Sequence, residues 1–447
     1  MKLKTVLSAV ICSALSLSVL SGCNVIGSDA DSLLRPPKSM GDEAEIEELI
    51  SKTASNGYTL KYPKSGSYRS AIVMQDLDND EKEEAIAFYR TRDNLTGIHM
   101  LVMYTKNDKW ELSADFKVET TDIDCVDFTD INGDGISEIL FGYSTYTPNT
   151  NVLTCYSYSN GKTTEIKSGQ NYSAFYCGDF NTDGKNEVMT LLLYSAENEA
   201  NATMLQYNEE KNSLYAKATV KMDPSIVKFK NVSVTYVDKT VKGIVVDGEF
   251  ANTEVNSQII YYNDELSLLR NPLYSEKKKN ITQRTSPVIC TDTDKDGIIE
   301  IPVISKFPHS DKEPVETVAD QIKWYSFIAE NESYVLKSRV AANYNFNYSI
   351  KLTEIAKDNT ITALSQLNNN SMKFYEWNKN KLGNELFEIK VFSSSQWDEG
   401  KIDDTYTLIY KDNKYAYTYK VINAKNQYSL TDDKIKTAFA ILSETAI

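Results

Sequence analysis

The sequence predicts an all-β protein assembled from repeated units of about 50 residues. Two observations lead to this expectation. From about Ser67 onward, short runs rich in Tyr, Val, Ile and Thr are separated by turns of Asn, Asp, Gly and Lys, which is typical of β-strands. A nine-residue acidic phrase of the form D-x-[DN]-x-D-G-x-x-E also recurs through the same region.

The four copies of this phrase begin at Asp76, Asp130, Asp179 and Asp292, so their starts are 54, 49 and 113 residues apart. The last interval is about twice the others, and a degenerate copy at 237–240, which has lost the ligand carboxylates of the pattern, fits its middle. Each acidic copy runs into apolar, strand-like residues. We therefore expect every copy to form a tight loop between two strands.

The residue types in the phrase suit a hard cation. Oxygen-bearing side chains at positions 1, 3 and 5, a carbonyl near position 7 and a carboxylate at position 9 can surround calcium, which accepts six to eight oxygen ligands. Glycine at position 6 takes the positive φ of the sharp turn at little cost. Because protein groups fill the ligand positions, such calcium is expected to be structural. The predicted ligands are Asp76, Asp78, Asp80, Glu84, Asp130, Asn132, Asp134, Glu138, Asp179, Asn181, Asp183, Glu187, Asp292, Asp294, Asp296 and Glu300.

Ordinary β-turns are the alternative to calcium-binding loops, and one of the four loops departs from the pattern. Asp, Asn and Gly also dominate ordinary β-turns for backbone reasons, so one such loop alone would be ambiguous. Four loops that share positions 1, 3, 5 and 9 favour calcium. The first loop carries Glu81 where the others have glycine, so its occupancy stays open.

A second repeated feature is a series of turns between tyrosine- or tryptophan-rich strands, each of which reads as a hairpin. A unit of about 50 residues with four strands has the size of a β-propeller blade. Six evenly spaced hairpins indicate six blades, and a closer seventh, completed by a strand at 58–62, favours seven, with six left as the alternative. The turns are expected at 107–108, 160–161, 209–210, 264–265, 330–331, 378–379 and 412–413.

The N-terminus resembles an export signal. Two lysines precede a short apolar run, and Leu-Ser-Gly then stands directly before Cys23, as in a bacterial lipobox. Residues 1–22 are therefore expected to be a signal peptide and Cys23 the acylated residue that anchors the protein to the membrane. A plain signal peptide with an incidental cysteine is the alternative. The predicted location is extracytoplasmic, lipid-anchored to the bacterial cell membrane.

The remaining organisation follows from composition. Residues 23–40 have the make-up of a tether. Residues 41–57 are expected to form a docked helix with Asp42 as its N-cap and Glu45 completing a capping box. Residues 58–447 are assigned to the propeller, whose incomplete last blade carries a C-terminal helix over about 431–442.

The net charge argues against one class of partner, and the cysteine spacing argues against a zinc site. Removal of residues 1–22 takes away two lysines and no acidic residue, so the net charge of −15 becomes −17, which argues against nucleic acid. We expect a monomer. Cys125, Cys155, Cys177 and Cys290 fit no zinc spacing, and their redox state is left open.

Catalytic motifs are not apparent in the sequence. It has two histidines, His99 and His309, and no G-x-S-x-G, H-E-x-x-H or P-loop motif. Pairs of acids for glycoside cleavage remain conceivable among its 63 acidic residues. We therefore expect a non-enzymatic binding or scaffold module for an extracellular protein or glycan. The alternative is an extracytoplasmic polysaccharide-active enzyme built on a propeller.

The acidic phrases resemble the FG-GAP and VCBS repeats of integrin-α-like β-propellers, over roughly residues 68–340. All sixteen predicted ligands match that pattern. The resemblance implies that each loop joins two strands of one blade and binds calcium structurally. The segment 33–89 also resembles the opening of secreted lipoproteins of clostridia-type bacteria that carry such repeats.

Overall fold

The computed structural model describes residues 41–54, 56–94, 96–285, 288–312, 317–352, 360–400, 402–430 and 432–442. The expected signal peptide, Cys23 and the tether lie outside the described residues. The described chain divides into two compact units. The first comprises residues up to Phe128 together with Gly135–Ser144 and Cys155–Glu165, and the second comprises Thr129–Asp134, Thr145–Thr154 and the chain from Ile166 onward.

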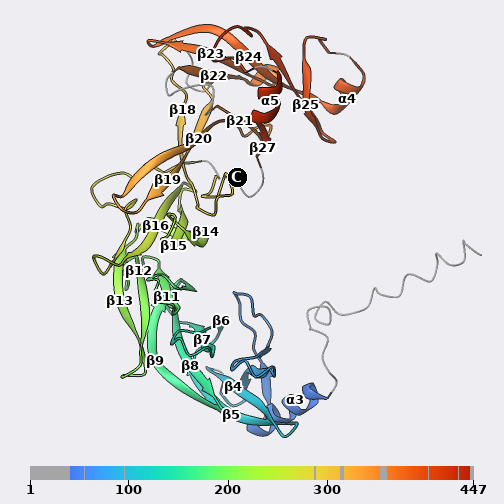
Figure 1. The fold of residues 1–447 in the computed structure, drawn as a ribbon. Helices are drawn as coiled ribbons and strands as arrows, with labels where there is room; N and C mark the ends of the chain where they lie inside the picture. Colours follow the sequence, from blue (N-terminus) through green and yellow to red (C-terminus); the bar gives the residue numbers. More distant parts are fainter. Residues whose placement is uncertain are drawn as a thin grey trace, which may run out of the picture. The chain divides into compact units, whose positions relative to one another are not determined.

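The repeating element is an antiparallel meander of four strands, and six meanders follow one another along the described chain (Figure 1). The first three are β2 (Ile72–Gln75), β3 (Glu84–Thr91), β4 (Gly97–Lys106) and β5 (Lys109–Glu119); β6 (Ile123–Thr129), β7 (Glu138–Ser144), β8 (Asn151–Ser159) and β9 (Lys162–Tyr172); and β10 (Ala174–Gly178), β11 (Glu187–Leu192), β12 (Asn201–Asn208) and β13 (Ser213–Lys221). A single parallel pair, Ser213 with Lys167, joins the third meander to the second in one eight-stranded sheet.

The last three meanders complete the strand inventory. They are β14 (Ile226–Tyr236), β15 (Lys242–Phe250), β16 (Val255–Asn263) and β17 (Leu268–Arg270); β18 (Ile301–Lys306), β19 (Asp320–Ile328), β20 (Ser333–Asn343) and β21 (Tyr348–Lys351); and β22 (Ile361–Gln366), β23 (Ser371–Asn378), β24 (Lys381–Ser393) and β26 (Tyr415–Val421). A fifth strand, β25 (Thr407–Lys411), pairs with β26. A 3-10 turn, Leu367–Asn369, connects β22 to β23, and the short helix α4 (Ser394–Asp398) follows β24.

The turn residues explain the meanders. All seven expected hairpin turns lie between consecutive strands. Asn107 and Asp108 have φ of 51° and 56°, and Asn160 and Gly161 have φ of 52° and 77°. Positive φ at both central residues is the geometry whose twist matches that of paired strands, and Asn, Asp and Gly adopt it most readily.

Successive sheets pack face to face within each unit. In the first unit, Val73, Ile86 and Phe88 of the first meander form one core with Ile139 and Phe141 of the second. In the second unit, one core joins the third meander to the fourth, another joins the fourth to the fifth, and a third joins the fifth to the sixth. The third meander shows where burial is greatest. Every residue of its second strand, β11, is buried, so this strand is covered on both faces, whereas most residues of its fourth strand, β13, are exposed or partly exposed.

Four-stranded antiparallel meanders stacked face to face are the blades of a β-propeller. The all-β class and the blade-like repeat expected from the sequence are thereby confirmed. The described strands form six blades, which is the smaller of the two expected numbers, because β25 and β26 belong to the sheet of β24 rather than to a separate blade.

Three local expectations were wrong. The strand β1 (Tyr58–Leu60) does not complete the last blade but pairs with β3, because the part of β3 beyond β2 offers a free edge. The C-terminal helix α5 covers only Asp432–Ala438, and Phe439–Ile441 form strand β27 on β21.

The third correction concerns the N-terminal helix, α3 (Asp42–Thr53), whose N-cap is Gly41 without a side-chain cap bond. Asp42 and Glu45 instead accept hydrogen bonds from the indole and main-chain N–H groups of Trp110. Ile46 and Ile50 pack against the first sheet, so the helix is docked as expected. Within the described part of the chain, no helix has the length and apolar character that crossing a bilayer requires.

Candidate metal centres

The four acidic loops share one construction. The first three lie between the first and second strands of their repeats, and the fourth lies directly ahead of β18, where Thr291 and Glu300 form an isolated antiparallel bridge. In every loop the position-9 glutamate is buried at or next to the start of the strand that follows. Relative exposures are 4% for Glu84, 1% for Glu138, 1% for Glu187 and 0% for Glu300. In three loops this carboxylate also accepts the main-chain N–H of position 2, from Leu77 to Glu84 (2.9 Å), from Phe180 to Glu187 (3.0 Å) and from Thr293 to Glu300 (2.7 Å).

The first loop brings three predicted ligands together. Carboxylate oxygens of Asp76, Asp78 and Glu84 all lie within 4.8 Å of one another. One buried oxygen of Asp76 and one of Asp78 have no hydrogen-bond partner. Burial, followed by the charges of Asp78 and Asp80, raises the pKa of Glu84 to about 7. A group of carboxylates this close, with oxygens left unsatisfied, is electrostatically suited to a cation.

The first loop also departs from the glycine pattern in its backbone. Glu81 has φ of 69°, while the glycines at the same position, Gly135, Gly184 and Gly297, have φ of 86° to 87°. The loop therefore keeps the conformation of the others although its residue pays a steric cost. With Glu81 in place of glycine, oxygens of Asp76, Asp78 and Glu84 still converge.

The fourth loop assembles in the same way, with oxygens of Asp292, Asp294 and Glu300 within 4.8 Å of one another. Asp292 accepts main-chain N–H groups at positions 4, 5 and 6, which shapes the turn. Burial, followed by hydrogen bonds with Thr293 and the charge of Asp294, determines the pKa of Glu300, which is raised overall. A basic side chain, Lys337, also reaches this loop, at 2.8 Å from both Asp294 and Asp296.

The third loop has two carboxylates, one carboxamide and the buried Glu187. Asp179 accepts the N–H groups of Asp183 and Gly184 at 3.2 and 3.1 Å. One oxygen of Glu187 has no hydrogen-bond partner, and burial, then the charges of Asp183 and Asp179, raises its pKa to about 7. Asn181 donates to Asp183 at 3.0 Å. The predicted residues are therefore neighbours, with the amide already bonded to one of the carboxylates.

The second loop crosses the boundary between the two compact units. Asp130, Asn132 and Asp134 belong to one unit and Glu138 to the other. Asp130 accepts the N–H of Gly133 at 2.6 Å, and Asn132 accepts that of Asp134 at 2.8 Å. These local bonds repeat the turn geometry of the other loops.

The degenerate repeat lies where the spacing placed it, between β14 and β15. Its one acidic residue, Asp238, accepts the main-chain N–H of Ala329 at 2.8 Å. Position 9 of the pattern falls within β15, where Val246 is buried and apolar. This loop therefore has the fold of the others without their ligand set.

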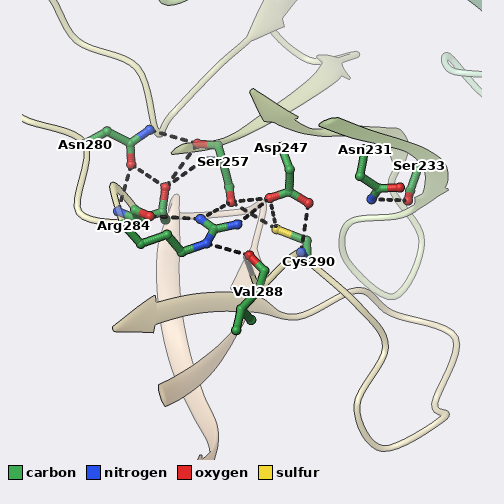
Figure 2. A network of polar contacts seen from close by, with 9 residues as sticks. Asn231, Ser233, Asp247, Ser257, Asn280, Arg284, Val288 and Cys290 are labelled. Carbon is green, nitrogen blue, oxygen red and sulfur yellow. Dashed lines mark hydrogen bonds and ion pairs between the residues drawn. The ribbon is translucent and has the colours of Figure 1, made fainter. Parts of the chain in front are cut away.

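A buried polar network, which the sequence did not suggest, fixes the chain ahead of the fourth loop (Figure 2). Arg284 and Asp247 form an ion pair at 2.8 Å, with side-chain exposures of 1% and 0%. Asp247 of β15 also accepts from Ser257 of β16 and from the main-chain N–H of Cys290. Arg284 donates further to the Val288 carbonyl. The network thus attaches the segment before Asp292 to the fourth blade.

The histidines, the four cysteines and the tryptophans lie outside the acidic loops. His99 bonds Asp115 at 2.9 Å, and His309 contacts the Phe307 carbonyl at 2.9 Å. Cys125, Cys155 and Cys290 are buried, and burial raises the pKa of Cys290 well above its ordinary range. Trp110, Trp324 and Trp377 are buried, whereas Trp397 in α4 is partly exposed.

No family model matches the chain, and the comparison with curated proteins gave no match. Among solved structures, the chain is similar to the exotype rhamnogalacturonan lyase YesX, with 12% identity over 64% of this chain and a TM-score of 0.28. It spans 57% of the length of that lyase. It is also similar to Saccharomyces cerevisiae Sqt1 (9% identity, 73% of this chain, 86% of that chain, TM-score 0.32) and to the Dos1 propeller (11%, 82%, 81%, 0.31). Likeness at this level has no bearing on activity.

Proposed function

We propose that the protein is a non-enzymatic binding or scaffold module whose propeller blades are stabilised by calcium. The observation that carries this proposal is the pair of carboxylate clusters at Asp76, Asp78 and Glu84 and at Asp292, Asp294 and Glu300. The unsatisfied buried oxygens of Asp76, Asp78 and Glu187 support it, because buried polar atoms ordinarily have partners. The residue set fits a hard, oxygen-preferring ion.

The FG-GAP and VCBS resemblance extends this proposal to all four loops. Bound calcium supplies positive charge and an oxygen-coordinating centre. The protein's own contribution is to hold Glu84, Glu187 and Glu300 in place through the position-2 N–H, so that these loops are shaped before the ion arrives. Each of the first three loops then ties together the first two strands of its blade, and the fourth ties the segment ahead of it to the start of β18. The assigned calcium ligands are the sixteen residues predicted from the sequence.

We also propose that the mature protein begins at an acylated Cys23 and is anchored outside the cytoplasm. This proposal rests on Lys2, Lys4, the apolar run and the Leu-Ser-Gly-Cys sequence. A labelled palmitate precursor is expected to be incorporated into the wild-type chain and not into Cys23→Ser. Incorporation into both, or release of the wild-type protein from membranes by high salt, would contradict it.

Binding is assigned to the surface rather than to a catalytic centre. The two histidines are engaged with Asp115 and with a main-chain carbonyl, and the metal loops use protein groups at their ligand positions. Such an arrangement reserves no position for an activated water. The partner proposed is an extracellular protein or a glycan, recognised by the chain acting as a monomer.

The proposal is tested by incubating the mature protein with a glycan array and with extracellular protein fractions, in calcium and in EGTA. We expect stoichiometric capture of one ligand class in calcium and weakened capture in EGTA. The matched control is a variant with Asp78→Asn, Glu187→Gln and Asp294→Asn together. Turnover of a polysaccharide, rather than capture, would replace this proposal with that of a polysaccharide-active enzyme.

A further inference from the structure

Lys337 is directed at the fourth metal loop by a β-bulge. In the pairing of β19 with β20, Trp324 opposes Ser338 and Tyr325 opposes Leu336, so that Lys337 is the additional residue between them. Its ammonium lies 2.8 Å from Asp294 Oδ2 and 2.8 Å from Asp296 Oδ2. These aspartates hold positions 3 and 5 of the phrase. A positive charge therefore already sits between two predicted calcium ligands.

The first loop has the same carboxylate cluster without such a cation. Among the described residues, no Lys, Arg or His forms an ion pair with Asp76, Asp78 or Asp80, and oxygens of Asp76 and Asp78 are buried without hydrogen-bond partners. In the fourth loop, by contrast, two of the acidic charges are offset by Lys337. The two clusters agree in geometry and differ in what neutralises them.

The third blade shows that the bulge alone does not produce this contact. In the pairing of β12 with β13, Met204 opposes Ala218 and Leu205 opposes Ala216, which makes Lys217 the additional residue. Lys217 is exposed, and within the described part of the chain it forms no ion pair. Asp183 of that loop is instead contacted by the Gln206 amide at 3.1 Å. Lys337 and Lys217 are thus a matched pair of lysines at equivalent positions.

We propose that Lys337 is a built-in cation of the fourth loop, which holds residues 292–300 folded without metal and competes with calcium for Asp294 and Asp296. An ion that coordinates both aspartates must displace the ammonium, whereas an ion entering the first loop displaces no basic side chain. The first loop therefore fills at a lower calcium concentration than the fourth. The competition with calcium rests on the proposed function, and the metal-free role does not.

The expected change in calcium affinity follows from how exposed the paired side chains are. The side chains of Lys337, Asp294 and Asp296 are about one-third exposed, so each ion pair is only of moderate strength. Competition from the two ion pairs together lowers the calcium affinity of this loop by roughly tenfold. Lys337→Met, which keeps the unbranched aliphatic stem, is expected to raise the calcium affinity of this loop by that factor. Lys337→Arg keeps the charge and should restore most of the competition.

The test is hydrogen–deuterium exchange of the full mature protein, followed in peptides that cover 292–300 and 76–84, in EGTA and across a calcium titration. In EGTA, Lys337→Met should speed exchange of 292–300 several-fold and leave 76–84 unchanged. In calcium, protection of 292–300 should return in Lys337→Met at about one-tenth of the concentration that the wild type requires. Lys217→Met is the control and should match the wild type in both peptides.

The outcomes separate the two proposals. If Lys337→Met leaves exchange of 292–300 in EGTA unchanged, the built-in cation is ruled out whether or not calcium binds. If calcium protects neither loop in any variant, the proposed metal function fails. The comparison in EGTA then still decides whether Lys337 holds residues 292–300 folded without metal. If Lys217→Met reproduces the effect of Lys337→Met, the result reflects general loss of surface charge, and the specific role of Lys337 is overturned.

Discussion

Glu187 accepts the main-chain N–H of Phe180 at 3.0 Å through one carboxylate oxygen, while its other oxygen is buried without a hydrogen-bond partner. The first oxygen shapes the loop and the second is left for a ligand. The same N–H bond recurs from Leu77 to Glu84 and from Thr293 to Glu300. A shared bond of this kind explains why the phrase places glutamate at position 9 even though the residue is nearly inaccessible to solvent.

Replacing Glu187 with Gln tests the role of the unsatisfied oxygen. The amide oxygen can still accept the Phe180 N–H, so the stability in EGTA should be unchanged or increased, since a buried charge is removed. Calcium stabilisation at this loop should be lost. For a site with a dissociation constant near 10⁻⁴ M, that loss is about 1.4 kcal/mol at 1 mM calcium. Urea unfolding measures it, with Glu209→Gln at a hairpin tip as the control.

Glu81→Gly should stabilise the first loop. Glu81 has φ of 69°, a conformation that costs a non-glycine residue about 1–2 kcal/mol, part of which is offset by the greater chain entropy of glycine. We expect a net gain of about 0.5–1 kcal/mol in the free energy of unfolding.

Gly184→Ala provides the converse measurement in the third loop. The glycine has φ of 87°, and no heavy atom lies within 4 Å of the position a Cβ would occupy. The substitution should therefore destabilise by about 1 kcal/mol through backbone strain alone. Equal effects of the same sign from Glu81→Gly and Gly184→Ala would contradict this explanation.

Asp247→Ala should be the most destabilising single change, because it leaves the Arg284 guanidinium buried without its counter-charge. Loss of one partner of a buried ion pair costs about 3–5 kcal/mol. Thermal and urea unfolding both measure this cost. The exposed Lys52–Glu48 pair is the control, and Glu48→Gln should leave the unfolding transition in place.

A pH titration of stability should depend on calcium. The pKa values of Glu84 and Glu187 are raised to about 7 from 4.5, so between about pH 4.5 and 7 the folded, metal-free protein binds more protons than the unfolded chain. Stability in EGTA should therefore fall as pH rises through this window. In excess calcium the slope should flatten or reverse, since the ion requires the deprotonated carboxylates. Chemical unfolding at pH 5, 6, 7 and 8 measures both slopes.

Local signals allowed most of the fold to be predicted. Asn160-Gly161 specifies its hairpin through positive φ, and the first three copies of the acidic phrase locate the first two strands of their repeats. Contacts between distant segments were not predictable in the same way. Phe439 and Leu442 continue the 3–4 spacing of Ile435 and Ala438, yet Phe439–Ile441 form a strand because the edge of β21 is available for pairing.

The candidate site was predictable to a similar degree. The phrase identified which oxygens belong together, because their spacing is local. Lys337 lies 37 residues beyond Glu300 in sequence and reaches the loop through a bulge, for which the sequence has no local mark. Arg284 stands in an irregular segment, so its pairing with Asp247 depends on blades whose packing is set by many other residues.

The most direct test of the account is the melting temperature of the mature protein in millimolar calcium and in EGTA, with magnesium at the same concentration as a control. The account predicts a rise of several degrees with calcium, smaller with magnesium, that is abolished when Asp78→Asn, Glu187→Gln and Asp294→Asn are combined. Identical melting in calcium and in EGTA would show that the acidic loops are turns without a metal.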